Sequence, residues 1–226
     1  MTDRLRVYHD PLVLSHGTGR FHPETPGRVA AVVDALGASG FPALRPPSPE
    51  RTVDALALVH DPGYVERFRE AAALGPAEPD RPFTLFDSPD NPMSRSTFEV
   101  SVRSAGLLLA AVDDVLAGAT RRAFVATRPP GHHALADRAM GFCFLNAVAV
   151  AARDAQLRHG VGKVLVADFD VHHGNGTQGT FWEDGSVAYL SVHRFPFYPG
   201  TGGRDETGSG AGRGLTANVP VPAGAG

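Results

Sequence analysis

Along the chain, short apolar runs alternate with longer segments in which apolar residues recur at helical spacing. The apolar runs have strand length and lie at residues 5–8, 123–127, 163–169, 187–192 and 216–221. Segments with an apolar stripe bounded by capping residues or glycine predict helices at 25–39, 61–74, 96–117 and 145–158, with a short one at 179–182. Strands alternating with helices predict an α/β fold, in which a parallel sheet has helices on both faces.

Composition narrows the class of protein. The 226 residues suit a single domain, 1–226, and the net charge of -3 gives no basic excess for binding nucleic acid. No apolar run is long enough for a membrane span, so we expect no membrane partner. Cys143 is the single cysteine, which excludes an intrachain disulfide and suits a reducing, cytoplasmic location. A segment rich in Pro and Asp, 76–92, is expected to be a surface loop.

Three unusual loops begin where predicted strands end, at Arg128, Asp168 and His193. In parallel α/β sheets, ligands bind outside the carboxyl ends of the strands. These loops are therefore the candidate functional site.

The loop after 163–169 carries the pattern D-F-D-V-H-H-G-N-G. Alternation along an extended chain places Asp168, Asp170 and His172 on one side. Two carboxylates and an imidazole packed together need a cation, and Asp and His are ordinary zinc ligands. The alternative is a solvated polar turn with an accidental cluster.

The other loops add weaker signals. His132 and His133, held by R-P-P-G, suit acid–base work because the imidazole pKa is near neutrality. Gly141 and Phe142 in M-G-F-C, with Tyr198 in the loop after His193, are candidates to line a narrow slot. For each of these the alternative is simple surface exposure or packing. Arg28, in the segment H-P-E-T-P-G-R, is a further candidate, but an ordinary surface charge explains it equally well.

Together the segments HPETPGR, RPPGHHA, MGFCF, DFDVHHGNGTQ and YPGTG resemble the histone deacetylase superfamily in order and spacing. This superfamily includes bacterial acetylpolyamine amidohydrolases and acetoin-utilisation proteins, and Asn175 is similar to the class II and bacterial branch. The resemblance implies an arginase/deacetylase-type sheet and a zinc-dependent deacetylase. Its expected substrates are acetylated lysine, polyamines or small acylated amines; no oligomeric state is predicted.

The resemblance also implies roles for individual residues. Asp170 and His172 would bind one Zn²⁺. His133 would be the general base and then the acid, His132 paired with Asp168 would support it, and Asn175 would orient it. Gly141, Phe142 and Tyr198 would form the substrate tunnel, although the family usually has Phe at the last position, and Arg28 would line an acetate channel. A structural monovalent cation, expected to be K⁺, would be surrounded by Asp168, Asp170, His172, Ser191 and Val192.

Two members of the family's site have no counterpart at the expected places. The family has a third metal-binding Asp and usually an oxyanion-stabilising Tyr, and the resemblance places both after residue 226. Downstream of His193 the chain has one Asp, Asp205, in a Gly-rich loop, and one Tyr, Tyr198, already assigned to the tunnel. We therefore expect an N-terminal fragment, with the C-terminal part of the domain missing and little activity of its own.

Two other functions compete with this hypothesis. An arginase-type ureohydrolase shares the fold, but it uses two manganese ions and a D-x-H-x-D pattern, the reverse of the D-x-D-x-H found here. A non-catalytic module that binds acylated amines is the alternative from another class. Measurements of zinc content and of acetyl-lysine turnover distinguish these hypotheses.

Overall fold

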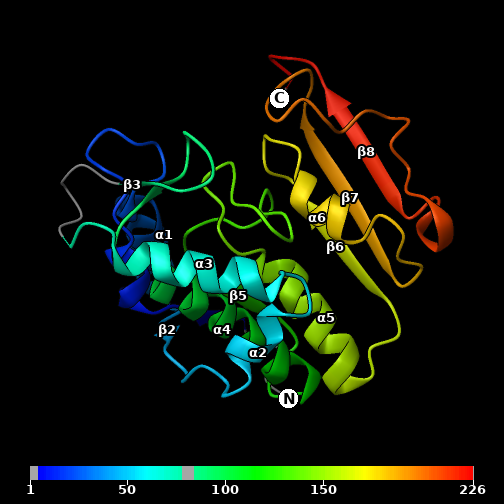
Figure 1. Cartoon of the computed structure of the whole chain (residues 1–226). Helices are drawn as coiled ribbons and strands as arrows, with labels where there is room; N and C mark the ends of the chain where they lie inside the picture. Colours follow the sequence, from blue (N-terminus) through cyan, green and yellow to red (C-terminus); the bar gives the residue numbers. More distant parts are fainter. Residues whose placement is uncertain (1–4, 78–83, 226) are drawn as a thin grey trace.

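The computed structural model describes residues 5–77 and 84–225, and within them the parallel strands form two separate sheets (Figure 1). The first has the order β2 (Ala43–Leu44), β1 (Arg6–Tyr8), β5 (Ala123–Val125). The second has the order β6 (Val164–Asp168), β7 (Val187–Arg194), β8 (Thr216–Val221). Every pairing in both sheets is parallel, as the alternation of strands and helices predicts.

Helices and one hairpin complete the fold. The α-helices are α1 (Pro26–Ala38), α2 (Thr52–Leu56), α3 (Pro62–Ala73), α4 (Thr97–Leu116), α5 (Ala147–His159) and α6 (Asn175–Thr180). Two short 3₁₀ helices, η1 (Pro11–Ser15) and η2 (Gly210–Gly212), and the antiparallel pair β3 (Thr84–Leu85) and β4 (Pro92–Met93) lie between them. The short helix predicted at 179–182 begins earlier, because the Gln178 N–H already bonds to the carbonyl of Gly174. In the described part of the chain, no helix is long and apolar enough to cross a membrane.

An aromatic core joins α3, α4 and the segment before α5. Phe68 is fully buried, stacks on Phe144 at 5.0 Å, and contacts Phe86 and Phe98 at 5.3 and 5.2 Å. Ring pairs at these separations add to the free energy gained by burying their area. This core fixes the backbone around Phe144, which directly follows the M-G-F-C segment.

The β6-β7-β8 sheet has two unlike faces. On one face Val187 and Phe181 pack against α5 in a small apolar core. The opposite face presents exposed apolar side chains, among them Leu165, Val192 and Val219 at 65, 41 and 38% exposure. Within the described residues, this sheet therefore differs from the expected layer with helices on both faces. The exposed side chains share one face because of the strand alternation: Leu165 pairs with Ala188, which lies on the same side of β7 as Val192, and Val192 pairs with Val219.

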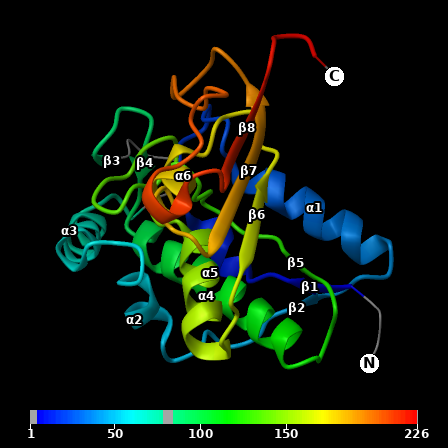
Figure 2. The same ribbon diagram turned by 90° about the vertical axis from the view of Figure 1, so that its right-hand side faces the viewer.

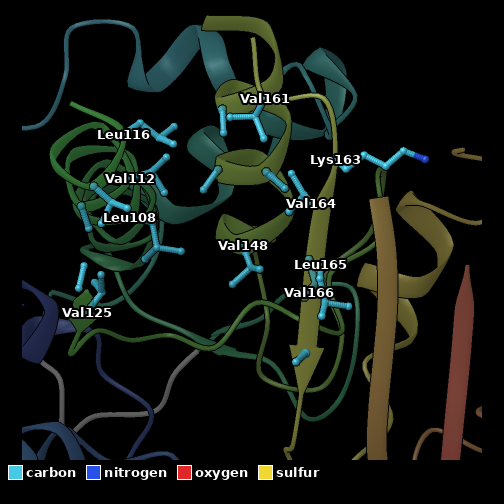
Figure 3. A pocket seen from close by; sticks show the side chains of 17 residues that line it. Leu108, Val112, Leu116, Val125, Val148, Val161, Lys163, Val164, Leu165 and Val166 are labelled. Atoms are coloured by element: carbon cyan, nitrogen blue, oxygen red, sulfur yellow. The ribbon is translucent and has the colours of Figure 1, made fainter. Parts of the chain in front are cut away.

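An apolar groove separates the two sheets (Figure 3). Its volume is about 620 Å³, and it is lined by side chains of α4, β5, α5 and β6 together with Val161 and Lys163. In the described residues, β5 and β6 each have a strand partner on one side only, and the groove lies between them. The parallel sheet predicted from the sequence is thus divided at this groove.

Candidate active site

The loops that follow β5, β6 and β7 meet at one cavity of about 470 Å³. Figure 2 shows the β6-β7-β8 sheet in a view in which its strands run side by side. The lining residues are Pro23, Glu24, Arg28, Asp90, Pro130, His132, His133, Gly141, Phe142, Asp170, Val171, His172 and Tyr198. The structure thus brings together candidates from distant parts of the sequence, as expected for the carboxyl ends of parallel strands.

His132 is held by Asp168 at the end of β6. The Nδ1 atom of His132 lies 2.9 Å from Asp168 Oδ2, which also accepts a hydrogen bond of 3.1 Å from the Tyr189 hydroxyl. Burial alone would raise the pKa of Asp168, but hydrogen bonding and charge from His132 hold this pKa below its usual value. An ionised carboxylate only accepts hydrogen bonds, so Nδ1 of His132 carries the proton. Nε2 of His132 then points toward Asp170, with 3.9 Å between it and Oδ1.

His133 is held by Asn175 at the start of α6. Its Nδ1 lies 2.8 Å from Asn175 Oδ1, an acceptor, so Nδ1 donates and Nε2 keeps a free lone pair. Burial, followed by the nearby charge of His132, lowers the pKa of His133 to about 4. The ring is therefore neutral at pH 7 and able to accept a proton.

Asp170 and His172 lie side by side in the loop after β6, with 3.0 Å between Asp170 Oδ1 and His172 Nδ1. Tetrahedral zinc with bonds of about 2.0–2.1 Å places neighbouring ligand atoms roughly 3.3 Å apart. The donor types and their separation thus fit two ligands of one zinc ion. The described residues contain no group of three or more His, Cys, Asp or Glu side chains arranged to hold a metal.

Two glycines allow the catalytic groups to approach one another. A Cβ on Gly141, which has φ of +58°, would lie 2.2 Å from Cδ2 of His133. A Cβ on Gly174 would lie 2.4 Å from Asp168 Oδ2 and 3.0 Å from His132 Nδ1. A side chain at Gly141 would displace His133, and a side chain at Gly174 would displace the Asp168 carboxylate that holds His132, so both positions favour glycine.

Aromatic rings form the walls of the cavity. Tyr198 meets His133 edge-on, with 5.1 Å between ring centroids, and Phe142 meets His22 at 4.5 Å. Phe142 has a left-handed backbone with φ of +68°, an unfavourable conformation for a bulky residue. The fully buried Asn91 holds it there: its Oδ1 accepts the Phe142 N–H at 2.9 Å, and its Nδ2 donates to the Cys143 carbonyl at 3.0 Å.

The other predicted residues lie around this centre. Arg28 lines the cavity from the first turn of α1, but its side chain is largely exposed. Ser191 is fully buried opposite Asp168 in the β6–β7 register, and Val192 follows it. Ser191 Oγ lies 2.9 Å from His193 Nδ1.

Sequence reasoning missed three contributors to the site. These are Asn91, Tyr189 and the buried ion pair between Glu24 and Arg128. The Arg128 guanidinium also donates to the His16 carbonyl at 2.6 Å, so it joins the R-P-P-G loop to the H-P-E segment. An arginine immediately after a strand and a glutamate within H-P-E were visible in the sequence. Nothing local indicated that they would meet across 104 residues.

His132 and His133, each with Nδ1 bound to an acceptor, thus lie beside Asp170 and His172 at the strand ends of an α/β fold. Residues 22–226 match the family model of the histone deacetylase domain, and the chain belongs to that family. A histone deacetylase-like amidohydrolase of Pseudomonas aeruginosa is 41% identical over 249 residues, covering 100% of this chain and 63% of that protein. Human polyamine deacetylase HDAC10 is 40% identical over 204 residues, covering 87% of this chain and 30% of that protein.

A solved structure shows the same fold. The crystal structure of the HDA15 HD domain matches with a TM-score of 0.87 and 37% identity, over 97% of this chain and 63% of that one. The arginase/deacetylase-type α/β fold expected from the motifs is thereby confirmed. The chain spans less than two thirds of the length of these relatives.

Proposed function

We propose that the chain carries the catalytic histidines of a zinc-dependent amidohydrolase that removes acetyl or related acyl groups from amines. One observation carries this proposal. His132 is hydrogen-bonded to Asp168 and His133 to Asn175, and both histidines lie beside the neighbouring side chains of Asp170 and His172. Membership of the deacetylase family supports the same reaction class.

The two histidines divide the proton transfers of amide hydrolysis. His133 takes a proton from the attacking water at Nε2, because Asn175 holds its other proton at Nδ1. The same atom then returns the proton to the departing amine, which must be protonated to leave. His132 remains beside it, with 4.0 Å between the ring centroids, and the negative charge of Asp168, to which His132 is hydrogen-bonded, would favour the positive charge that His133 acquires during the transfer.

Asp170 and His172 would hold the zinc ion. When bound, zinc polarises the acyl carbonyl and makes water acidic enough to react at neutral pH. A potassium ion is proposed at Asp168, Asp170, His172, Ser191 and Val192. The buried Ser191 lies opposite Asp168 in the sheet, which supports this placement.

The test measures zinc content and turnover together. The protein is purified from zinc-supplemented culture, its metals are determined by mass spectrometry, and fluorogenic acetyl-lysine is offered as substrate. In a form of the protein that also carries a third metal ligand, we expect zinc rather than manganese, and released acetate that depends on zinc; residues 1–226 alone should release little. Two manganese ions with urea release from arginine would instead favour the ureohydrolase.

The non-catalytic alternative predicts a different combination of results. Acetyl-lysine would bind without release of acetate in any form of the protein, with or without added zinc. Binding is measured by calorimetry on the same sample, so the two functions give opposite outcomes in one experiment.

A further inference from the structure

A network of hydrogen bonds outside the cavity joins two loops of the candidate active site. Its centre is Gln178 on α6, which is 7% exposed. Nε2 of Gln178 donates to Glu206 Oε2 at 2.6 Å, and Oε1 of Gln178 accepts from Asn218 Nδ2 at 2.8 Å. His173 Nε2 lies 2.9 Å from the same Oε1. All four side chains lie outside the lining of the cavity, so they take no part in the proposed proton transfers.

The carboxylate of Glu206 fixes the orientation of the Gln178 amide. A carboxylate only accepts hydrogen bonds, so the amide nitrogen faces Glu206 and the amide oxygen faces away from it. His173 therefore carries its proton on Nε2, and its Nδ1 accepts from the Thr201 hydroxyl at 2.7 Å. Turning the amide over would set its oxygen against the carboxylate, so the network has one consistent arrangement.

Glu206 also holds the Gly-rich loop between β7 and β8. Its Oε1 accepts the N–H groups of Gly202 and Gly203 at 2.8 and 2.9 Å. Burial alone would raise the pKa of Glu206, but hydrogen bonds from Gly203, Gln178 and Gly202 hold this pKa below its usual value. Gly202 has φ of +97°, and a Cβ there would lie 2.4 Å from His193 Nε2, so the loop lies directly against β7. The Gly-rich loop is thus fixed on two sides.

The same loop carries one wall of the cavity. Tyr198 lines the cavity and comes shortly before Gly202 in the chain. Its neighbour Phe197 stacks on His172, with 5.0 Å between ring centroids. The wall segment is therefore anchored at its start by ring stacking at the site and at its end by Glu206.

The helix at the other end of the network has supports of its own. The Thr177 N–H of α6 donates to the His132 carbonyl at 3.0 Å, and the Thr177 hydroxyl accepts from the Asn146 amide at 3.0 Å. These bonds do not pass through Glu206. Loss of the Gln178–Glu206 bond should therefore release the Gly-rich loop rather than α6.

We propose that Gln178 and Glu206 are positioning residues, whose bond holds the Gly-rich loop against α6 and so sets the place of Tyr198 in the wall that an acylated amine meets. The two residues do not touch the ligand and act through Tyr198. This inference rests on the proposed function, which supplies the acylated amine. A wall that is fixed before the ligand arrives costs less conformational entropy on binding.

Swapping the two residues tests the contact without a change of size. Gln178→Glu sets two carboxylates against each other, and their repulsion should drive the loop away from α6. Gln178→Glu combined with Glu206→Gln, the swapped variant, reverses donor and acceptor and should restore the contact. Glu206→Gln alone leaves an unmatched amide N–H and should give a smaller effect of the same sign. Gln156→Glu on α5, where the amide lies between Ser186 and Arg153, is the matched control.

Hydrogen exchange of backbone amides measures the loop in the protein without ligand. The amides of Gly202 and Gly203 should exchange at least about tenfold faster in Gln178→Glu than in the unmodified protein, and at the unmodified rate in the swapped variant. The Thr177 amide should exchange at one rate in all variants, because its bond to His132 lies outside the network. Equal acceleration at Thr177 would mean that the substitution loosens the whole fold, and it would overturn the positioning role.

Ligand affinity separates positioning from mere support of the fold. The dissociation constant of acetyl-lysine for the zinc-loaded protein is measured by calorimetry, at a temperature where every variant is folded. Gln178→Glu should bind about three- to tenfold more weakly, whereas the swapped variant and Gln156→Glu should bind as the unmodified protein does. Faster exchange in the loop with unchanged affinity would show that the pair holds the loop without placing Tyr198, and the proposal would fail.

The remaining outcomes separate this inference from the proposed function. If Gln178→Glu does not fold, Glu206→Gln and the swapped variant decide the question by the same two measurements. Binding that follows the expected pattern, without acetate release in any form of the protein, supports the positioning role and overturns the deacetylase function alone. A swapped variant that binds as weakly as Gln178→Glu overturns the positioning role alone. An unmodified protein that neither binds acetyl-lysine nor releases acetate in any form overturns both.

Discussion

Two cavities of the chain have comparable volumes, about 620 and 470 Å³, but they differ in chemistry. The groove between β5 and β6 is lined by Val, Leu and Ala, with Lys163 at its edge. The cavity at the strand ends contains His132 and His133, the Asp170–His172 pair and Arg28. Volume alone would favour the groove over the other cavity as the functional site, although Lys163 is the single ionisable side chain among the residues that line it.

The difference follows from where each cavity lies on the strands. The groove runs along strand edges, where alternating side chains are apolar because a sheet interior is expected there. The other cavity lies beyond the strand ends, where the chain turns and polar residues can converge. Position relative to the strands therefore locates the chemistry better than size does.

The largest effect expected from this comparison is on turnover. In any form of the protein that hydrolyses acetyl-lysine, His133→Ala should lower kcat about 100- to 10,000-fold, because a general base is lost. Its zinc content should not change, whereas Asp170→Ala should lose zinc. Leu116→Met in the groove is the control and should leave kcat unchanged. Near-normal turnover by His133→Ala would show that another group accepts the proton.

The next effect concerns stability. Arg51 donates to Asp154 at 2.9 and 2.7 Å and to Asp113 at 2.7 Å, and so connects α2 to α5 and α4. Asp154 is 2% exposed, so Arg51→Ala would leave a buried charge without its partner. We expect a loss of about 3 kcal/mol in the free energy of unfolding, measured with urea. Arg69→Ala, which breaks an exposed pair with Glu66, should have no measurable effect. If Arg51→Ala lowers the free energy of unfolding as little as Arg69→Ala does, then Asp154 becomes hydrated by solvent in the variant.

The motifs of the candidate site could be found in the sequence because each is contiguous and follows an apolar strand. Alternation predicted that Asp170 and His172 would lie near Asp168, but β6 ends at Asp168, and the turns beyond it place both residues through the Asp170 N–H bond to Asp168 and the His172 N–H bond to Asp170. Asn91 and Tyr189 were not predicted, because their partners are 51 and 21 residues away and the contact depends on the completed fold. The division of the sheet was not predicted either, since an apolar strand has the same sequence whether or not its edge is paired.

A smaller effect is expected from acid. His60 is buried between the Leu135 carbonyl, which accepts from Nδ1, and the Asn146 N–H, which donates to Nε2, and burial lowers its pKa to about 4. Between pH 6.5 and 4 the unfolded chain therefore binds a proton that the folded chain does not, and stability falls as pH falls. His60 therefore lowers the free energy of unfolding by at most about 3 kcal/mol as the pH falls through this window, and the loss is complete only below the folded pKa.

The measurement is urea unfolding between pH 7 and 4. His60→Gln retains a hydrogen-bonding side chain but does not titrate, so its stability should depend less steeply on pH. Burial also lowers the pKa of His16, His133 and His173, and Asp184 and Glu206 have lowered pKa values as well, so the slope should fall rather than vanish. An unchanged slope would assign the acid sensitivity to these other groups.

The smallest effect is expected at the groove itself. Leu165 is an apolar side chain on β6, but it is 65% exposed, so replacing it removes few contacts in this chain. Leu165→Ser should change the unfolding free energy of residues 1–226 by less than about 0.5 kcal/mol. Leu107→Ser, at a fully buried position of α4, should cost several times more. If Leu165→Ser costs as much as Leu107→Ser, and the cost grows with protein concentration, then a second copy of the chain covers the groove in solution. The groove would then be a protein–protein contact surface, and the two cavities would differ as a protein-binding site differs from a small-molecule site.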